Sequence, residues 1–186
     1  MILRTPLTPL LAATVALVLV VLLFAVGCSS DDEPNGESTT ERANNIDGLG
    51  EELAEGLPEE IAGFAGWEKL NFEPIPPKSS DPHLGVKDVF YNGTSREAEA
   101  VDNGEAPYPE GSLIVKTATR PDADFVGLIA IMRKIKGIDR EHNDWEFVEY
   151  TRETPDQSFE VIARDAVCWT CHMDAEPTDF VYTRRG

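Results

Sequence analysis

The chain has 186 residues, and its 34 acidic side chains outnumber its 16 basic ones, which gives a formal net charge of −18. A surface this negative repels phosphate backbones and anionic membrane surfaces, so nucleic acid is not an expected partner. The charge suits a basic redox partner protein or a small neutral or cationic molecule, and it also keeps an exported protein soluble. The length allows a single domain with accessory segments.

Residues 1–27 have the pattern of a secretion signal peptide. Arg4 precedes an almost wholly apolar run, Leu10–Val26, and Gly27 then leads to Cys28. This ending resembles a bacterial lipobox, in which Cys28 is lipidated and becomes the mature N-terminus, although Ala25 stands where leucine is usual. The run is long for a signal and close to the shortest membrane span, so an uncleaved helix is the alternative. Both predict an extracytoplasmic protein anchored to a bacterial membrane, in the periplasm or at the cell surface.

Residues 28–60 are predicted to form a lipidated, acidic and flexible tether. The segment is rich in acidic and small residues and offers little apolar surface to repay the entropy of ordering it. A short helix over Leu49–Leu57 is the one element that we allow for in it. Residues 61–186 are long enough to form one folded domain.

Strand patterns dominate residues 61–186. They lie in Leu113–Thr119, Phe125–Ile135, Trp145–Arg152 and Phe159–Ile162. The first is rich in β-branched residues and follows a turn, the second is long enough to permit a helix instead, and the third alternates, with Trp145 and Phe147 on one face. The fold class predicted is α+β, mainly an antiparallel β-sheet with a C-terminal helix.

The C-terminal helix is expected to begin near Arg164 or Asp165, and the negative charge of Asp165 suits a first helical turn. It would carry Cys168-Trp169-Thr170-Cys171-His172, a C-x-x-C-H stretch. This is the attachment signature of c-type haem: each thiol adds to one vinyl group, and the histidine lies beneath the iron as axial ligand. The motif predicts one covalent haem c per chain, with His172 on the metal.

A bare C-x-x-C also occurs in redox dithiols and in zinc sites. Zinc would need two more ligands, and the remaining candidates, Cys28, His83 and His142, are scattered along the chain. A thioredoxin-type dithiol would open a helix within a βαβ unit, and no such unit follows the motif. With Cys28 lipidated and the other two cysteines joined to haem, no thiol is left over in an oxidising compartment.

The second axial position of the iron separates two kinds of haem protein. Electron-transfer cytochromes fill it with methionine or a second histidine, for which Met132, His83 and His142 are the candidates. Met132 lies among apolar residues, as expected of core filling, and both histidines lie in polar segments where exposure to solvent is expected. Met173 follows His172 directly and cannot reach the opposite side of the same iron. We therefore expect a five-coordinate iron that binds a small molecule.

The order of several stretches resembles the cytochrome P460 and cytochrome c′-beta family. They are Pro107–Lys116, Asp144–Phe147, and Cys168–His172 followed by Asp179–Thr183. In ordinary cytochrome c the haem motif lies near the N-terminus instead. The resemblance covers roughly the region from residue 85 to residue 185. It implies an antiparallel-sheet homodimer with one haem per chain, His172 as proximal ligand and an open distal side.

The resemblance also implies a chemistry. P460-type members oxidise hydroxylamine or related nitrogen oxides and carry an extra bond from a lysine to the haem, and Lys116 occupies the matching place. A lysine at a strand end with its charge in solvent is the alternative. Such enzymes use a distal carboxylate as proton relay, for which Glu141, Asp144 and Glu146 are the candidates. Without the bond and the relay, the protein would bind gases as a cytochrome c′-beta does.

Two functions remain open from the sequence. The first is an extracytoplasmic, membrane-tethered c-type haem protein with five-coordinate iron that binds or oxidises hydroxylamine or nitric oxide. The second is a membrane-anchored electron-transfer cytochrome with six-coordinate haem. A redox partner protein is expected in either case.

Overall fold

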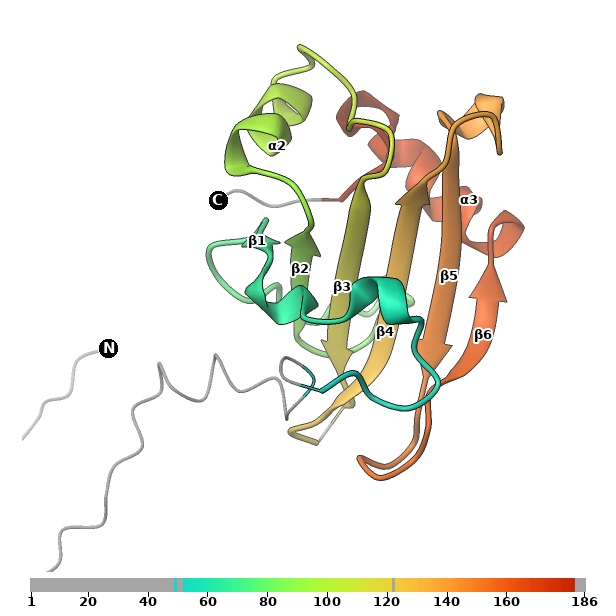
Figure 1. Ribbon diagram of the computed structural model, residues 1–186. Coiled ribbons are helices and arrows are strands. Elements are labelled where there is room, and N and C mark those ends of the chain that lie inside the picture. Colours follow the sequence, from blue (N-terminus) through green and yellow to red (C-terminus); the bar gives the residue numbers. More distant parts are fainter. Residues whose placement is uncertain (1–48, 50–51, 122, 183–186) are drawn as a thin grey trace, which may run out of the picture. The chain divides into compact units, whose positions relative to one another are not determined.

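The computed structural model describes residues 49, 52–121 and 123–182, all within one compact unit. Within that part of the chain, six strands form one sheet in chain order, and every neighbouring pair is antiparallel (Figure 1). The strands are β1 (Glu68–Lys69), β2 (Lys87–Tyr91), β3 (Leu113–Thr119), β4 (Val126–Lys134), β5 (Trp145–Thr151) and β6 (Glu160–Arg164). The helices are α2 (Ser95–Asp102) and α3 (Ala166–His172), with 3-10 turns η1 (Glu59–Ile61), η2 (Phe64–Gly66), η3 (Arg140–His142) and η4 (Met173–Thr178). The expected α+β class, with a mainly antiparallel sheet and a C-terminal helix, is confirmed.

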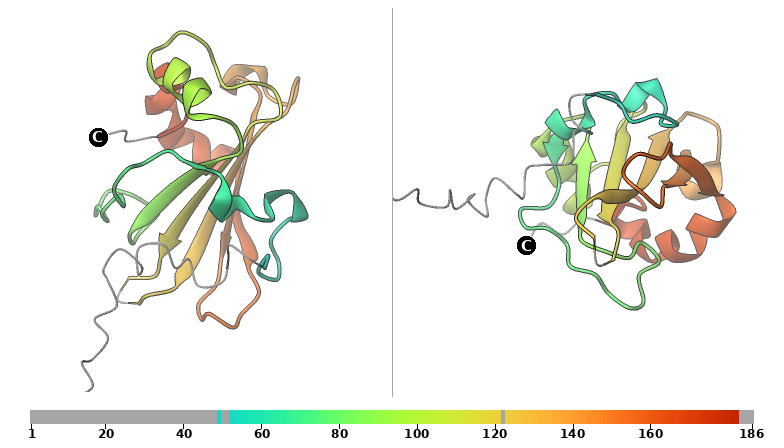
Figure 2. Two further views of the ribbon diagram at one scale, coloured as in Figure 1. Left: turned by 60° about the vertical axis from the view of Figure 1, so that its left-hand side comes forward. Right: turned by 90° about the horizontal axis from the view of Figure 1, so that it is seen from below.

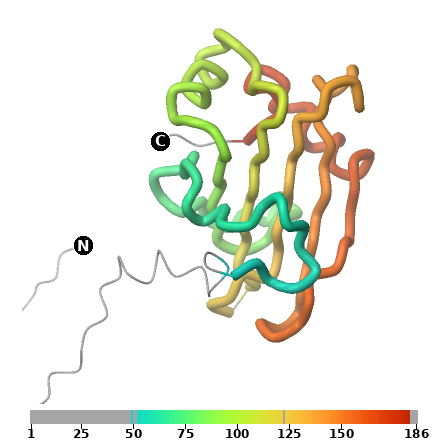
Figure 3. Tube along the Cα trace, viewed as in Figure 1, coloured from blue at the N-terminus to red at the C-terminus, as the bar shows by residue number. Residues whose placement is uncertain are grey.

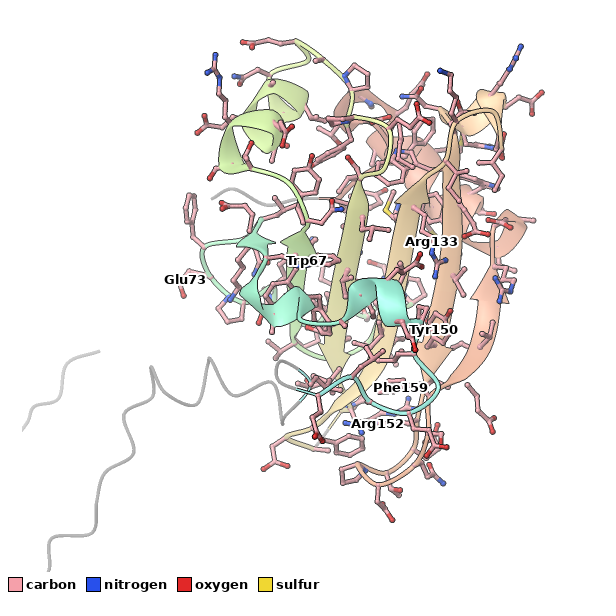
Figure 4. All side chains as sticks on the ribbon, in the orientation of Figure 1. Trp67, Glu73, Arg133, Tyr150, Arg152 and Phe159 are labelled. Atoms are coloured by element: carbon pink, nitrogen blue, oxygen red, sulfur yellow. The ribbon has the colours of Figure 1, made fainter. Side chains whose placement is uncertain are left out.

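One face of the sheet, which we call the closed face, is covered by the N-terminal segment. The turns η1 and η2 cross in front of it in Figure 1, and Figure 3 follows the same path of the chain. The cluster buried there consists of Phe90, Val115, Val126, Ile129, Ile131, Val148 and Tyr150 with Leu49, Leu57, Ile61, Phe64 and Phe159. Arg133 and Tyr150, labelled in Figure 4, lie on this same side. Apolar packing fills this face.

The opposite face, which we call the cavity face, carries α3 and the loop 76–86. The right-hand view of Figure 2 shows both on the far side of the sheet from η1 and η2. Because successive strand residues point to opposite faces, Ile114 belongs to this side and Val115 to the closed one. The cluster on this side consists of Leu70, Val89, Tyr91, Ala98, Val101, Tyr108, Ile114, Met132, Trp145, Phe147, Phe180 and Val181.

The strands expected from the sequence are present, and the stretch that also permitted a helix is strand β4. The short strand β1, strand β2 and helix α2 were missed. Strand β2 follows a loop rich in proline and polar residues, and α2 begins with a capping box at Thr94 and Glu97. The Thr94 hydroxyl accepts from the Glu97 amide at 3.3 Å, and the Glu97 carboxylate accepts from the Thr94 amide at 2.8 Å. The spacing T-x-x-E is a sequence signal that could have located this helix.

The folded part of the chain begins before residue 61, where the domain was expected to start. Leu49 and Leu57 are buried in the closed-face cluster, and Gly56 adopts φ +88° where a Cβ would meet the carbonyl of Phe159. The described residues between 49 and 57 contain no helix, so the helix allowed for there is wrong. The predicted signal peptide, Cys28 and most of the predicted tether lie outside the described residues. Among the described residues, none of the helices combines the length and apolarity that crossing a membrane requires.

Candidate functional site

A cavity of about 600 Å³ opens on the cavity face between the sheet, the loop 76–86 and α3. Its volume lies within the range of roughly 300–1,000 Å³ typical of cofactor sites. Most of its wall is apolar, from side chains such as Val89, Ile114, Ala130, Met132 and Phe147. Its polar lining includes Asp81, His83, Lys87, Lys116, Glu149, Cys168, Cys171 and His172. The structure therefore brings Lys116 together with the whole C-x-x-C-H set.

Helix α3 presents the motif to the cavity from one side. Cys168, Cys171 and His172 stand at positions i, i+3 and i+4, which share one face of a helix. The start of the helix is tied to β5, because the Asp165 carboxylate accepts from the Phe147 amide at 3.0 Å. Asp165 lies before the first turn and makes no side-chain cap, so its charge is used on the neighbouring strand rather than on the helix end. This tie fixes the motif relative to the sheet.

The two cysteines are free thiols in the structure, one half-buried and one exposed. Burial, with nearby Glu149 and Asp165, raises the pKa of the Cys168 thiol to about 11. Redox dithiols need the opposite shift, since the thiolate is the reactive form. Among the described residues no group of three or more His, Cys, Asp and Glu side chains is placed to hold a metal ion by itself. Neither the dithiol nor the zinc interpretation gains support.

His172 has the surroundings of an axial ligand. It is buried, and its Nδ1 lies 2.6 Å from the backbone oxygen of Phe180, so that nitrogen donates and Nε2 is left for a metal. The rings of Phe147 and Tyr182 meet it edge-on, with centroids 4.6 and 5.3 Å away. Desolvation, with the charge of Lys116, lowers the pKa of His172 to about 4. The ring is therefore neutral at pH 7, as metal binding requires.

The carbonyl that holds His172 is itself held by a buried polar cluster. Asp179 and Phe180 both adopt positive φ, at 52° and 65°, in the turn that presents the Phe180 oxygen. The Asp179 carboxylate pairs with Lys134 at 2.7 Å, accepts from the Tyr108 amide at 2.8 Å and is bonded by Asn143. Two of the stretches that carried the family resemblance, around Tyr108 and Asp179, therefore meet here to position the haem motif.

Lys116 lies within strand β3, paired with Val89 and Ala130, and lines the cavity. Its Nζ is 3.5 Å from His83 Nδ1 and 6.0 Å from the centroid of the Tyr182 ring. Desolvation lowers the pKa of the Lys116 amine, and the negative charge of Asp81 partly opposes that shift. The alternative of a strand-end lysine with its charge in solvent does not describe this position.

The three candidates for the sixth ligand differ in their positions. Met132 is 6 % exposed and packs in the cavity-face cluster, as expected, although it also touches the cavity. His142 does not line the cavity; its ring bonds to Asp139 at 2.7 Å and stacks on Trp169 with centroids 3.6 Å apart. His83 lines the cavity, with 12 % of its side chain exposed. The expectation that both histidines are solvated is wrong, because each has partners that hold it against the protein.

The carboxylates proposed as distal relay do not line the cavity. Glu146 pairs with Arg133 at 2.9 Å on the closed face, Glu141 lies beside a separate open pocket, and Asp144 precedes β5. The carboxylates that do line the cavity include Asp81 and Glu149. The alternation that turns Trp145 and Phe147 toward this face also turns Glu149 there, so this residue was within reach of sequence reasoning.

The arrangement fits a covalently held haem: two thiols and a neutral, oriented histidine face one largely apolar cavity. Comparison with known proteins agrees, because residues 61–183 match the family model of cytochrome P460. No protein with curated annotation matches the chain. The family is one of c-type haem proteins that act on nitrogen species, typically outside the cytoplasm. The chain belongs to the cytochrome P460 family.

Proposed function

We propose that the protein is a membrane-tethered haem c protein whose iron has one protein ligand, His172, and an open opposite side. One haem per chain is bonded to Cys168 and Cys171, and the open side binds or oxidises hydroxylamine or nitric oxide. The observation that carries the proposal is that one cavity contains both the C-x-x-C-H set and a polar group of Lys116, His83 and Glu149.

The interactions of the other candidate ligands support an iron with an open side. His142 is engaged by Asp139 and Trp169, and Met132 is part of the buried cluster. Both ring nitrogens of His83 face partners, Nδ1 toward Lys116 and Nε2 toward Glu149 at 3.5 Å each. Each candidate thus has an interaction that ligation of iron would have to replace.

The residues that line the cavity would have different roles in the reaction. A bound haem would supply an iron that binds the nitrogen of the substrate and accepts its electrons. His172 is kept neutral and oriented by the Phe180 carbonyl, and the apolar wall around Val89, Ile114 and Phe147 excludes water. Protons leaving the substrate need an acceptor, and the carboxylates of Glu149 and Asp81 stand on the cavity wall.

Lys116 is our candidate for an additional bond to the haem. Its lowered pKa increases the fraction of neutral amine, which is the form able to bond to carbon. With this bond we expect a red-shifted ferrous Soret band and an intact mass below chain plus haem by the lost hydrogens. A mass equal to chain plus haem, with ordinary c-type spectra, would remove Lys116 from this role.

The anchoring proposal concerns residues outside the described part. We propose that Cys28 is lipidated after cleavage of residues 1–27, since buried acyl chains contribute roughly 0.8 kcal/mol per methylene and more than one chain is needed for stable binding. The acidic segment that follows would hold the haem domain away from the membrane. A homodimer and a basic redox partner protein are the assemblies we expect.

Catalysis is tested by offering hydroxylamine to the purified haem protein with a soluble electron acceptor. Turnover in the wild type that Lys116→Ala lowers by an order of magnitude or more supports the oxidase proposal. Nitric oxide binding without turnover would limit the function to gas binding. The electron-carrier alternative, favoured only by the contact of His83 and Met132 with the cavity, requires a low-spin haem that His83→Ala or Met132→Ala converts to high spin.

A further inference from the structure

His83 stands at the centre of a group of charged side chains from different elements. Its Nδ1 is 3.5 Å from the Lys116 amine of β3, and its Nε2 is 3.5 Å from the Glu149 carboxylate of β5. On its own loop, Asp81 approaches Nδ1 at 3.8 Å. The ring thus joins an amine within the cavity to two carboxylates.

The loop that carries His83 is shaped around a buried ammonium group. Lys87, 2 % exposed, donates to the carbonyls of His83 and Gly85 at 3.1 Å each and to that of Pro76 at 3.4 Å, and it pairs with Asp81 at 2.9 Å. A buried charge is tolerated when it is hydrogen-bonded in this way. Gly85 has φ +97°, and a Cβ there would overlap the carbonyl of Thr119. These contacts fix the conformation of the loop and place His83 in the cavity wall.

The contacts of His83 link the Lys116 amine to two carboxylates of different exposure. Lys116 lines the cavity, and desolvation lowers the pKa of its amine. His83 is 12 % exposed, and the side chains of Glu149 and Asp81 are 13 % and 25 % exposed. Histidine is the side chain whose ordinary titration lies between pH 5 and 8, and its two nitrogens can take up and release different protons. A proton that reaches His83 can pass to Glu149 on the cavity wall or to Asp81, which is the more exposed of the two carboxylates.

We propose that His83 is the proton relay of the cavity, taking a proton on one ring nitrogen while the other gives one to Glu149 or Asp81. The proposal rests on the proposed function, in which each N–H or O–H bond broken in hydroxylamine releases one proton and one electron. A bound haem would accept the electron, and His83 would take the proton. Lys87 is a positioning residue, since it acts through the loop.

The charged and titratable groups that interact with His83 or its loop come from several elements, and Lys78 and Asp174 also line the same cavity. The interacting groups are Asp81 on its own loop, Lys87 on β2, Lys116 on β3, Glu149 on β5 and His172 on α3. His172 would be bound to iron and silent. Desolvation raises the pKa of Asp81, but hydrogen bonds and charge interactions with Lys87 and His83 outweigh it and lower that pKa, so this carboxylate titrates below the histidine range. We therefore expect any pH dependence of the haem potential between pH 5 and 8 to require the His83 ring, which contacts both Lys116 and the two carboxylates.

The test is the reduction potential of the haem in the purified holoprotein, measured across pH 5 to 9. Reducing the iron adds a negative charge that favours protonated His83, so by linkage the potential falls as pH rises through the histidine range. We expect His83→Gln to remove this dependence. The control His142→Gln deletes a histidine outside the cavity and should keep it. Glu149→Gln removes a carboxylate that stabilises the protonated ring, so the transition should move to lower pH.

Each result decides the proposal. An unchanged pH profile in His83→Gln overturns it, and so does a transition that Glu149→Gln leaves in place. A low-spin haem that becomes high-spin in His83→Gln would make the residue an iron ligand and also overturn it. Should His83→Gln lose its haem, the shift in Glu149→Gln decides alone. Failure of the wild type to bind nitric oxide or carbon monoxide would overturn the proposed function instead, because the potential profile does not depend on ligand binding.

Discussion

The two faces of the sheet are made by the same strands but have different roles. The closed face is packed by apolar side chains from the N-terminal segment, and its charged groups, such as Arg133 with Glu60 and Glu146, form ion pairs with one another. The cavity face has an apolar cluster as well, but its packing is interrupted by a cavity with amine, imidazole, thiol and carboxylate groups. Side-chain alternation along each strand thus places residues that stabilise the fold on one face and reactive groups on the other. Substitutions on the closed face should change stability, and substitutions in the cavity should change haem binding and reactivity.

The largest effect is expected at the haem motif on the cavity face. Replacing both Cys168 and Cys171 by alanine removes the two thioether positions, so haem should be absent from the denatured chain. Haem staining after denaturing electrophoresis measures this, with His142→Ala as the control that keeps the stain. Covalent haem that persists in the double variant after Lys116 is also replaced by alanine would contradict the assignment of the cavity, because no proposed bond to the haem would then remain.

On the closed face, the expected effect is on stability alone. Phe64 is fully buried against Phe90, with ring centroids 5.5 Å apart, so Phe64→Ala should cost about 3–5 kcal/mol of unfolding free energy. Phe72→Ala, at a side chain that is 76 % exposed, is the control and should change stability by less than about 0.5 kcal/mol. Denaturant unfolding gives both values. A change in the haem spectrum of folded Phe64→Ala would mean that the faces are coupled.

A third substitution concerns the buried pair that supports His172. Asp179→Ala leaves Lys134 buried without its partner, which should cost about 3–5 kcal/mol. Replacing both residues together, Lys134→Met with Asp179→Leu, should recover much of that stability. If the double variant regains stability but its axial ligation is altered, the pair is needed to position the Phe180 carbonyl. An equal loss in both variants would show that the charges themselves are not what matters.

The pH response of the proximal ligand is the next effect in size. The folded pKa of about 4 for His172 lies below the ordinary 6.5, so its contribution to stability is complete above pH 6.5 and is lost as pH falls toward 4. Binding to iron favours the neutral ring further. The Soret band should therefore report His172 on the iron down to about pH 4. Loss of His172 from the iron near pH 6.5 would show that burial does not lower the pKa of its ring.

The smallest effect is expected for a carboxylate that the sequence offered as the relay. Glu146 pairs with Arg133 on the closed face and is partly exposed, so Glu146→Gln should cost about 1 kcal/mol or less and leave substrate turnover unchanged. Glu149→Gln, three positions along the same strand but in the cavity, is the matched comparison. Loss of turnover in Glu146→Gln would show that Glu146 takes part in the reaction.

The contrast between the faces also marks what the sequence could predict. A run of β-branched residues after a turn identified β3, and an alternating pattern identified β5. The spacing of Cys168, Cys171 and His172 identified the haem chemistry. All of these signals are local. The burial of Leu49 and Leu57 and the position of His83 depend on contacts with distant strands. A polar loop is expected in solvent unless a buried group such as Lys87 orders it, and that contact has no local pattern. Glu149 was recoverable from strand alternation, whereas the tie from Phe180 to His172 was not.

The most direct test is the optical spectrum of the ferrous protein with and without carbon monoxide. We expect a high-spin haem with His172 as its one protein ligand, and we expect carbon monoxide to bind it with a large Soret shift. We also expect His83→Ala and Met132→Ala to leave this response in place. A low-spin ferrous spectrum that carbon monoxide does not change would show that the iron is closed on both sides, and would contradict the open cavity on which the proposed function depends.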